Sequence, residues 1–193
     1  MDIQPSNILP EIRILKPDVF RDERGGFFET FHAGKYRAQG IDPGFVQDNF
    51  SFSVKNVIRG LHYQVGRPQG KLVWVPEGEV FDVAVDVRRG SPTFGRWAGH
   101  LLSSENNLQL WIPAGFAHGF AVRSERALFA YKCTDFYDPS LERGIRWDDP
   151  DLNIPWEAGP QPVVSAKDRQ FPLLAAIPED DLPSYEIIRT SRP

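Results

Sequence analysis

The stretch Glu79–Val87 reads EVFDVAVDV, and polar and apolar side chains alternate along most of it. A period of two residues is what a β-strand shows when its two faces meet different surroundings. One face carries Phe81, Val83, Val85 and Val87, and the other carries Asp82 and Asp86. The stretch therefore predicts a strand with an apolar face and two aspartates on the opposite face.

Similar short apolar runs lie on both sides of this stretch, at regular spacing. Turn-forming Gly, Pro, Asn and Asp residues separate them, as in Arg89–Pro92 and Pro113–Gly115. Evenly spaced short strands are typical of an all-β sandwich or barrel, which is the fold class we predict. The further strands predicted are Lys71–Val75, Trp97–Leu102, Leu108–Ile112, Phe116–Arg123 and Arg126–Thr134.

Helical patterns are scarce, so only short peripheral helices are expected. His32–Gln39 is one candidate, ended by Gly40, and Leu173–Ile177 is a weaker one. The last 44 residues hold 8 of the 17 prolines. They predict an extended C-terminal tail that wraps the barrel, with Trp156 and Phe171 packing on it. We expect one domain over residues 1–193, with a core at about 12–175 and a tail at 178–193.

Composition excludes several classes of partner. The net charge of −4 offers no general attraction for nucleic acid or an anionic membrane. No apolar run approaches the roughly 20 residues that a membrane helix needs. The N-terminus lacks the basic and apolar segments of a signal peptide, so a cytoplasmic protein is expected. Cys133 is the single cysteine, which excludes an intrachain disulfide and indicates a buried strand residue.

His62 is the first candidate for chemistry, in the segment RGLHYQ at residues 59–64. A lone histidine is more often a surface or structural residue. Arg59 precedes it and Lys71 follows, yet in a regular strand Arg59 and His62 would face opposite ways. A bulge at Gly60 would bring both side chains to one face.

Three other residues carry alternatives that their own segments leave open. His118 could line a cavity or could be a core histidine bonded to the backbone. Tyr131, in an apolar run, could be a core aromatic or a general acid, because a phenol stays protonated near neutral pH. Asp168 could belong to a helix-capping Ser165–Asp168 box or could orient a histidine.

Two further features concern anions and metals. Arg24 lies in the turn-like segment DERGG, where it is either solvated or a phosphate ligand. A histidine metal site in a β-barrel typically begins with a His-x-His pair on one strand, but the residues from His62 read His62-Tyr63-Gln64. No metal is therefore expected.

Taken together, these segments resemble the dTDP-4-dehydrorhamnose 3,5-epimerase family. The resemblance runs in order from about residue 12 to about residue 175. It rests on FRDERGGFFE (20–29), QDNFS (47–51), RGLHYQ (59–64), QGK (69–71), SPTFG (91–95), WIPAGFAHGF (111–120), ERGIRWDDP (142–150) and SAKD (165–168).

The resemblance implies a cupin-type β-jelly roll, or double-stranded β-helix, that forms a homodimer, usually with N-terminal strand exchange. The implied substrate is dTDP-4-dehydro-6-deoxy-D-glucose, and the implied reaction inverts C3 and C5. His62 would be the base with Asp168 as its partner, Tyr131 the acid, and Lys71 the cation near the C4 oxygen. The implied substrate-binding residues are Arg24, Glu29, Gln47, Asn49, Arg59, His118, Tyr137, Glu142 and Lys167, with Tyr137 stacked on thymine.

The residue types suit that chemistry. The hydrogens at C3 and C5 both lie α to the C4 ketone, so a base can remove either to give an enolate. Histidine supplies a base near neutral pH, and Lys71 can stabilise the oxyanion. Inversion then needs a proton from the opposite face. No redox step occurs and the chain has no Gly-rich dinucleotide fingerprint, so no cofactor is expected.

Two alternatives remain open at this level. The first is an enzyme that inverts only C3 or only C5, or isomerises the ketone, since the same scaffold serves these reactions. The second is a non-catalytic cupin that merely binds a sugar nucleotide. The joint presence of His62, Tyr131 and Asp168 disfavours a binder, which needs neither base nor acid.

Overall fold

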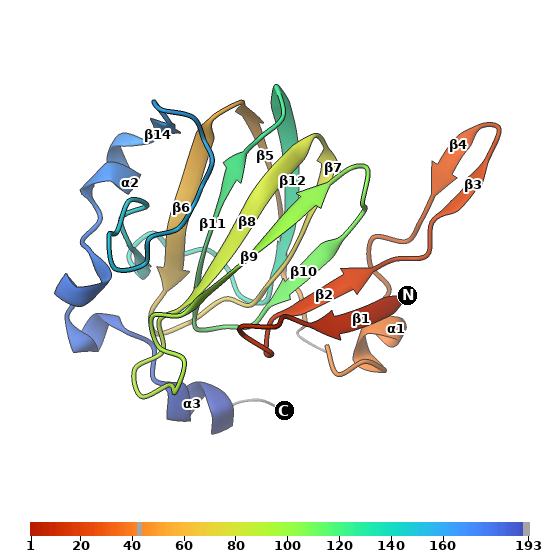
Figure 1. Cartoon of the computed structure of the whole chain (residues 1–193). Coiled ribbons are helices and arrows are strands. Elements are labelled where there is room, and N and C mark those ends of the chain that lie inside the picture. The colour runs from red at the N-terminus through yellow and green to blue at the C-terminus, as the bar shows by residue number, and fades with distance from the viewer. Residues whose placement is uncertain (42–43, 191–193) are drawn as a thin grey trace.

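The computed structural model describes residues 1–41 and 44–190, and two β-sheets form its body (Figure 1). Neighbouring strands within each sheet are antiparallel. The first sheet has the order β1 (Asp2–Pro5), β2 (Arg13–Lys16), β10 (Gln109–Ile112), β7 (Lys71–Glu77), β12 (Arg126–Cys133), β5 (Gln47–Val54). The second has the order β13 (Glu142–Gly144), β6 (Val57–Gln64), β11 (Phe116–Val122), β8 (Glu79–Asp86), β9 (Trp97–Ser103).

Smaller elements lie around these sheets. The hairpin of β3 (Phe20–Asp22) and β4 (Gly25–Phe27) projects from the body (Figure 1). Strand β14 (Val163–Val164) pairs in parallel with β6. The helices are α1 (Ala33–Arg37), α2 (Ala166–Gln170) and α3 (Tyr185–Thr190), with 3₁₀ turns η1 (Leu174–Ala176) and η2 (Glu179–Asp181). The all-β class predicted from alternation is confirmed.

Strand β8 shows how alternation builds two cores. Val80 and Ala84 belong to the cluster of buried residues between the sheets. Val83 and Val85 belong to a second cluster, on the outer face of the second sheet. Asp82, on the same face as Val80 and Ala84, therefore points into the space between the sheets.

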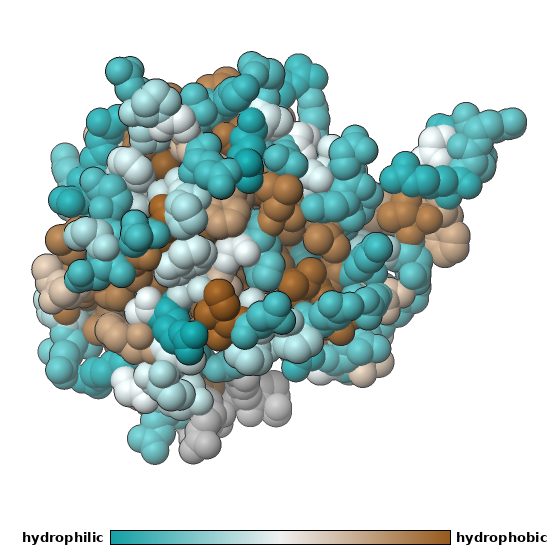
Figure 2. Space-filling view, viewed as in Figure 1, coloured by the Kyte–Doolittle hydropathy of each residue, from teal (hydrophilic) through white to brown (hydrophobic). Residues whose placement is uncertain are grey.

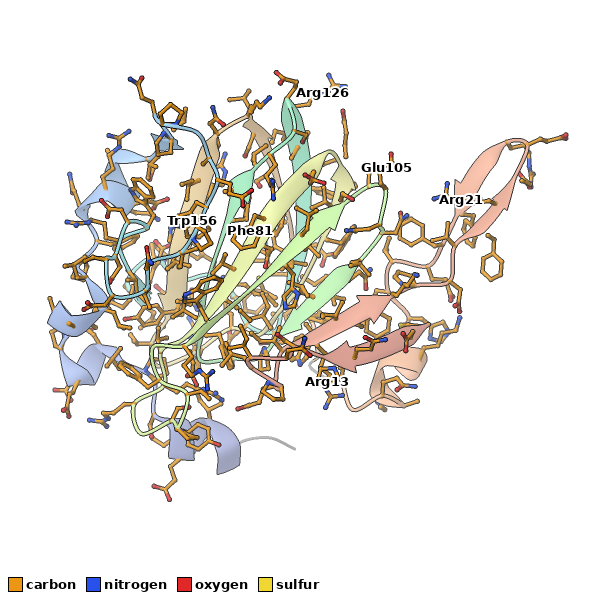
Figure 3. All side chains as sticks on the ribbon, in the orientation of Figure 1. Arg13, Arg21, Phe81, Glu105, Arg126 and Trp156 are labelled. Atoms are coloured by element: carbon orange, nitrogen blue, oxygen red, sulfur yellow. The ribbon has the colours of Figure 1, made fainter. Side chains whose placement is uncertain are left out.

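The C-terminal tail covers that outer face, as predicted. Trp156 is buried in the second cluster, and its indole N–H donates to the carbonyl of Trp147 at 2.7 Å. Figure 3 shows Trp156 and Phe81 on the side of the sheet where the tail lies. Farther on, the Tyr63 hydroxyl donates to the carbonyl of Asp181 at 3.0 Å, which fastens the tail to β6.

The two predicted helices form in shortened versions. Helix α1 spans Ala33–Arg37, with His32 as its N-cap, whose Nδ1 accepts from the Lys35 amide. Gly40 follows with φ of +73°, a conformation that glycine adopts without strain. The Leu173–Ile177 segment contains only the 3₁₀ turn η1, because too few residues there can continue a helix before Pro178.

Candidate active site

A cavity between the two sheets holds most of the predicted site residues. It has two lobes that share His62, Lys71 and Tyr131. The first lobe is lined by Gln47, Asn49, Tyr63, Gln64, Gln69, Cys133, Tyr137 and Glu142. The second is lined by Ser51, Val57, Ile58, Arg59, His118, Gly119, Phe120, Phe129, Val163, Val164, Ser165, Lys167 and Asp168.

His62 and Asp168 form a hydrogen-bonded pair in this cavity. The His62 Nε2 lies 2.8 Å from Asp168 Oδ1, and the Gly60 amide donates to Asp168 Oδ2 at 3.3 Å. Burial acts to raise the pKa of Asp168. The interaction with His62 and the hydrogen bonds with the Gly60 amide and the Ser165 side chain outweigh it, and they hold the pKa below its ordinary value. A charged Asp168 fixes the orientation of the imidazole, so that its other ring nitrogen can face the cavity as a general base.

The Ser165–Asp168 segment combines the two alternatives, because it caps a helix and its carboxylate also contacts a histidine. Ser165 is the N-cap of α2, and its hydroxyl accepts from the Asp168 amide at 3.0 Å. The Asp168 carboxylate turns away from the helix toward His62, which leaves the capping box half-formed. The cap therefore sets the position of the Asp168 carboxylate.

The predicted bulge at Gly60 is present. The pairing of β6 with β11 shifts register between His118–His62 and Phe120–Arg59, so Arg59 and His62 both line the second lobe. Gly60 has φ of +126°, and a Cβ there would lie 2.5 Å from the Gly119 Cα. Only glycine fits this crossing of two backbones.

Tyr131 and Lys71 enter the cavity from the first sheet, whereas His62 enters from the second. Burial raises the pKa of Tyr131, so the phenol stays protonated and able to donate. Burial lowers the pKa of Lys71, and the nearby Cys133, Glu142 and Asp82 oppose that effect. A base and an acid on different sheets can address two faces of one bound molecule.

Glu142 connects two other predicted residues at the cavity. Its Oε2 accepts from Lys167 Nζ at 2.7 Å and from the Tyr137 hydroxyl at 2.9 Å. Gln47 and Asn49 lie beside them in the first lobe, and Gln47 Oε1 accepts from the Tyr137 amide at 2.9 Å. These polar groups form a wall able to bind an uncharged heterocycle or sugar hydroxyls.

Arg24 and Glu29 are not brought to the cavity of their own chain. Arg24 lies at the turn of the β3–β4 hairpin, paired with Asp22, and its side chain is 85% exposed. Glu29 pairs with Lys35 of α1. The hairpin stands clear of the body in Figure 2, so one chain alone cannot complete the predicted set.

Sequence reasoning missed one partner in the site. His118 Nε2 lies 2.8 Å from Asp82 Oδ2, so His118 is paired with a carboxylate and not with the backbone. The signal was the alternation in β8, which placed Asp82 opposite the apolar face without saying what it meets. Within residues 1–41 and 44–190, no group of three His, Cys, Asp or Glu side chains is arranged to hold a metal.

Comparison with known proteins identifies this arrangement. Residues 6–176 match the dTDP-4-dehydrorhamnose 3,5-epimerase family. The chain belongs to this family. The dTDP-4-dehydrorhamnose 3,5-epimerase of Pseudomonas aeruginosa is 56% identical over 163 residues, which cover 84% of this chain and 90% of that protein.

Two solved structures extend the comparison. The epimerase RmlC from Legionella pneumophila, in complex with dTDP-4-keto-L-rhamnose, is 54% identical with a TM-score of 0.92, covering 95% of this chain and 98% of that one. A more distant relative is ChmJ, a 3'-monoepimerase from Streptomyces bikiniensis in complex with dTDP-quinovose. It is 32% identical with a TM-score of 0.90, covering 98% of each chain.

The family assignment settles fold class and enzyme class together. The structure is the cupin-type jelly roll expected from the resemblance, with short helices outside it. The chain is an isomerase-class enzyme, a sugar epimerase, as predicted. In the part of the chain that the structure describes, no helix is long and apolar enough to span a membrane.

Proposed function

We propose that the chain inverts C3 and C5 of dTDP-4-dehydro-6-deoxy-D-glucose and so forms dTDP-4-dehydro-L-rhamnose. One observation carries the proposal: His62 on one sheet, paired with Asp168 of α2, shares a cavity with Tyr131 and Lys71 on the other sheet. A non-catalytic binder would not need a histidine base, a protonated phenol and a half-buried lysine in one cavity.

The four residues have separate roles in the proposed mechanism. His62 removes the proton at C3 or C5, and Asp168 stabilises the imidazolium that forms. Negative charge then develops on the C4 oxygen, where Lys71 stabilises the enolate. Tyr131 donates a proton from the other face, and the carbon is inverted. The whole sequence moves only protons, so it needs neither a metal nor a redox cofactor.

Incubation with the 4-keto-6-deoxy substrate in deuterated water tests this function. NMR of the sugar should show deuterium at both C3 and C5 and the L-rhamno configuration in the product. Deuterium and inversion at one carbon alone would replace the proposal with a single-site epimerase, the activity named for ChmJ. Migration of the ketone would indicate a ketoisomerase, and binding without any exchange would leave only the binder.

The remaining cavity residues bind the nucleotide part in this proposal. Arg59 and Lys167 neutralise the diphosphate, Gln47, Asn49 and Glu142 contact the nucleoside or sugar, and Tyr137 stacks on thymine. The exposed Tyr137 ring at the edge of the first lobe suits stacking.

Replacing Arg59 with alanine should weaken binding of dTDP. Arg59 is exposed, with Nε donating to Ser53 at 3.0 Å, so its guanidinium has donors left for a phosphate. Its exposure favours the lower end of the range for charged hydrogen bonds, about 1.5 kcal/mol or roughly tenfold in affinity. Calorimetry with dTDP measures the affinity. Arg126→Ala is the control, because Arg126 begins β12 and does not line the cavity. Equal affinity in wild type and Arg59→Ala would remove Arg59 from the diphosphate site.

We propose that the working unit is a homodimer. Strand β5 is the edge of the first sheet, and it exposes Phe50, Phe52 and Val54. A long apolar edge strand favours association unless something covers it. The projecting hairpin exposes Phe20 and Phe27. A second copy that covers β5 with its hairpin would bury both sets and bring its Arg24 and Glu29 toward the cavity.

A charge at position 52 should break this dimer. Phe52 is 77% exposed in the isolated chain, so Phe52→Asp should not disturb the fold of the monomer. Burying one phenylalanine is worth about 1.5–3 kcal/mol, and a dimer buries two. The dissociation constant of the dimer should therefore rise by at least about 100-fold. Light scattering across a dilution series measures this. Leu101→Asp, on the edge strand β9 of the other sheet, should stay dimeric. A monomeric wild-type protein at micromolar concentration would refute the proposal.

We also propose that residues 1–193 act as one epimerase domain in the cytoplasm. The segment after residue 149 supplies Asp168 and Lys167 to the cavity, so the site needs both this segment and the barrel. Cys133, the single cysteine, is buried and free, which suits a reducing compartment.

A further inference from the structure

A second histidine–carboxylate pair lies beside the first. His118 of β11 is the direct register partner of His62 of β6, and both line the second lobe. Facing residues on adjacent antiparallel strands have Cβ atoms about 4.5–5.5 Å apart. Each imidazole is backed by its own aspartate at 2.8 Å, Asp168 for His62 and Asp82 for His118.

The two aspartates have different surroundings. Asp168 also accepts from the Gly60 amide, whereas Asp82 is fully buried, and its Oδ1 has no hydrogen-bond partner among the described residues. Leaving a buried carboxylate oxygen unpaired is unfavourable by at least about 1–3 kcal/mol. A leucine or valine on this inner face would avoid that cost, so packing alone gives no reason for an aspartate at position 82.

The charge of Asp82 acts on the residues that face the ketone. Its carboxylate holds His118 directly and opposes the effect of burial on the pKa of Lys71. Within the proposed mechanism, Lys71 stabilises the enolate oxygen. Asp82 is thus a buried carboxylate that holds His118 and favours the charged, proton-donating form of Lys71.

We propose that Asp82 is a positioning residue for enolate formation: by binding Nε2 of His118, it fixes that ring and presents Nδ1 to the sugar beside His62. This inference rests on the proposed epimerase function. The two pairs then divide the work: Asp168 supports the base, and Asp82 holds the ring whose Nδ1 accepts from a sugar hydroxyl and so keeps the reacting C–H bond in line with His62. The carboxylate fixes the tautomer of the ring. The nitrogen bonded to it, Nε2, carries the proton, so Nδ1 is left as the acceptor.

The Asp82→Asn variant tests the proposal, because it keeps the side-chain size and removes the charge. Misdirecting one preorganised group typically costs about 10²-fold in rate, so kcat should fall by that factor. The KM should change by less than about threefold, because a misaligned sugar still occupies the cavity although its C–H bond no longer faces His62. Deuterium exchange at C3 and C5 should fall in parallel with product, because enolate formation precedes both.

Asp86→Asn is the matched control. Asp86 is a fully buried aspartate on the same strand, but it binds Arg88, Ser91 and Thr93 and does not line the cavity. This variant should unfold at a lower temperature and keep wild-type kcat and exchange when folded. Wild-type kcat in folded Asp82→Asn, or equal losses of kcat in both variants, would overturn the proposal. No turnover by the wild type would instead refute the proposed function.

A measurement on the wild type keeps the proposal testable if Asp82→Asn does not fold. ¹⁵N NMR of labelled histidine reports the protonation of each ring nitrogen, and the chain has 4 histidines to assign. We expect the His118 Nε2 to carry a proton, and its signals to shift when the substrate is added. An unprotonated Nε2 in His118, or signals that ignore the substrate, would show that Asp82 does not position this ring for the reaction.

Discussion

In the His62→Ala protein, we expect deuterium exchange at C3 and C5 and product formation to disappear together. Both need the enolate. The His62 imidazole lies in the cavity and is bonded to Asp168, whose pKa is lowered, so that its carboxylate stays charged. Loss of general acid–base assistance typically lowers the rate by about 10²–10⁴-fold. Single-turnover NMR in deuterated water measures exchange and inversion in one experiment.

The outcome separates His62 from its neighbour His118. If His62→Ala still exchanged at the wild-type rate, the base would be elsewhere, and His118 would be the next residue to test. His32→Ala is a suitable control, since His32 caps α1 on the surface and lies outside the cavity lining. That control should lose about 1 kcal/mol of stability at most and keep its rate.

The alternation in the sequence was sufficient for the centre of the fold and insufficient at its edges. Strand β8 follows the predicted pattern, with Val83 and Val85 under the tail. Strand β5 escaped the same reasoning because its large residues point outward: Phe50 and Phe52 are exposed, and the buried Ser53 faces the other way. Such inverted polarity makes sense only if another surface covers the strand, and a single sequence does not display that surface.

Irregular backbone was the second limit, and it mattered most at the site. A strict period of two separates Arg59 from His62, and only the register shift at Gly60 brings them together. The glycine suggested such a shift, but the need for it lies in the backbone of Gly119, which is 59 residues away in the chain. Local patterns do not contain a contact between distant backbones.

Family resemblance supplied roles that geometry in one chain does not yet support. Arg24 and Glu29 stand outside the cavity, so their roles depend on the proposed partner subunit. Conversely, the pairing of His118 with Asp82 emerged only from the structure, because a polar residue in an apolar strand does not reveal its partner. The candidate site was thus predicted in its residue types and incompletely in its arrangement.

Replacing Tyr131 with phenylalanine should separate exchange from inversion. Burial raises the pKa of Tyr131, so in the wild type the phenol holds a proton throughout the neutral range and can donate it from the first sheet. Phenylalanine keeps the ring that packs against Phe129, so the fold should persist.

Without that donor, His62 can still form the enolate and return a solvent-derived proton to the face it came from. Deuterium should therefore continue to enter C3 or C5 while the yield of inverted product falls by about 10²–10⁴-fold. Tyr36→Phe is the matched control, because the buried Tyr36 hydroxyl bonds Gln109 away from the cavity and its loss should affect stability alone. Parallel loss of exchange and inversion in Tyr131→Phe would mean that the phenol helps to form the enolate. The proton donor would then be another residue. The exposed Tyr137 of the first lobe would be the next phenol to replace.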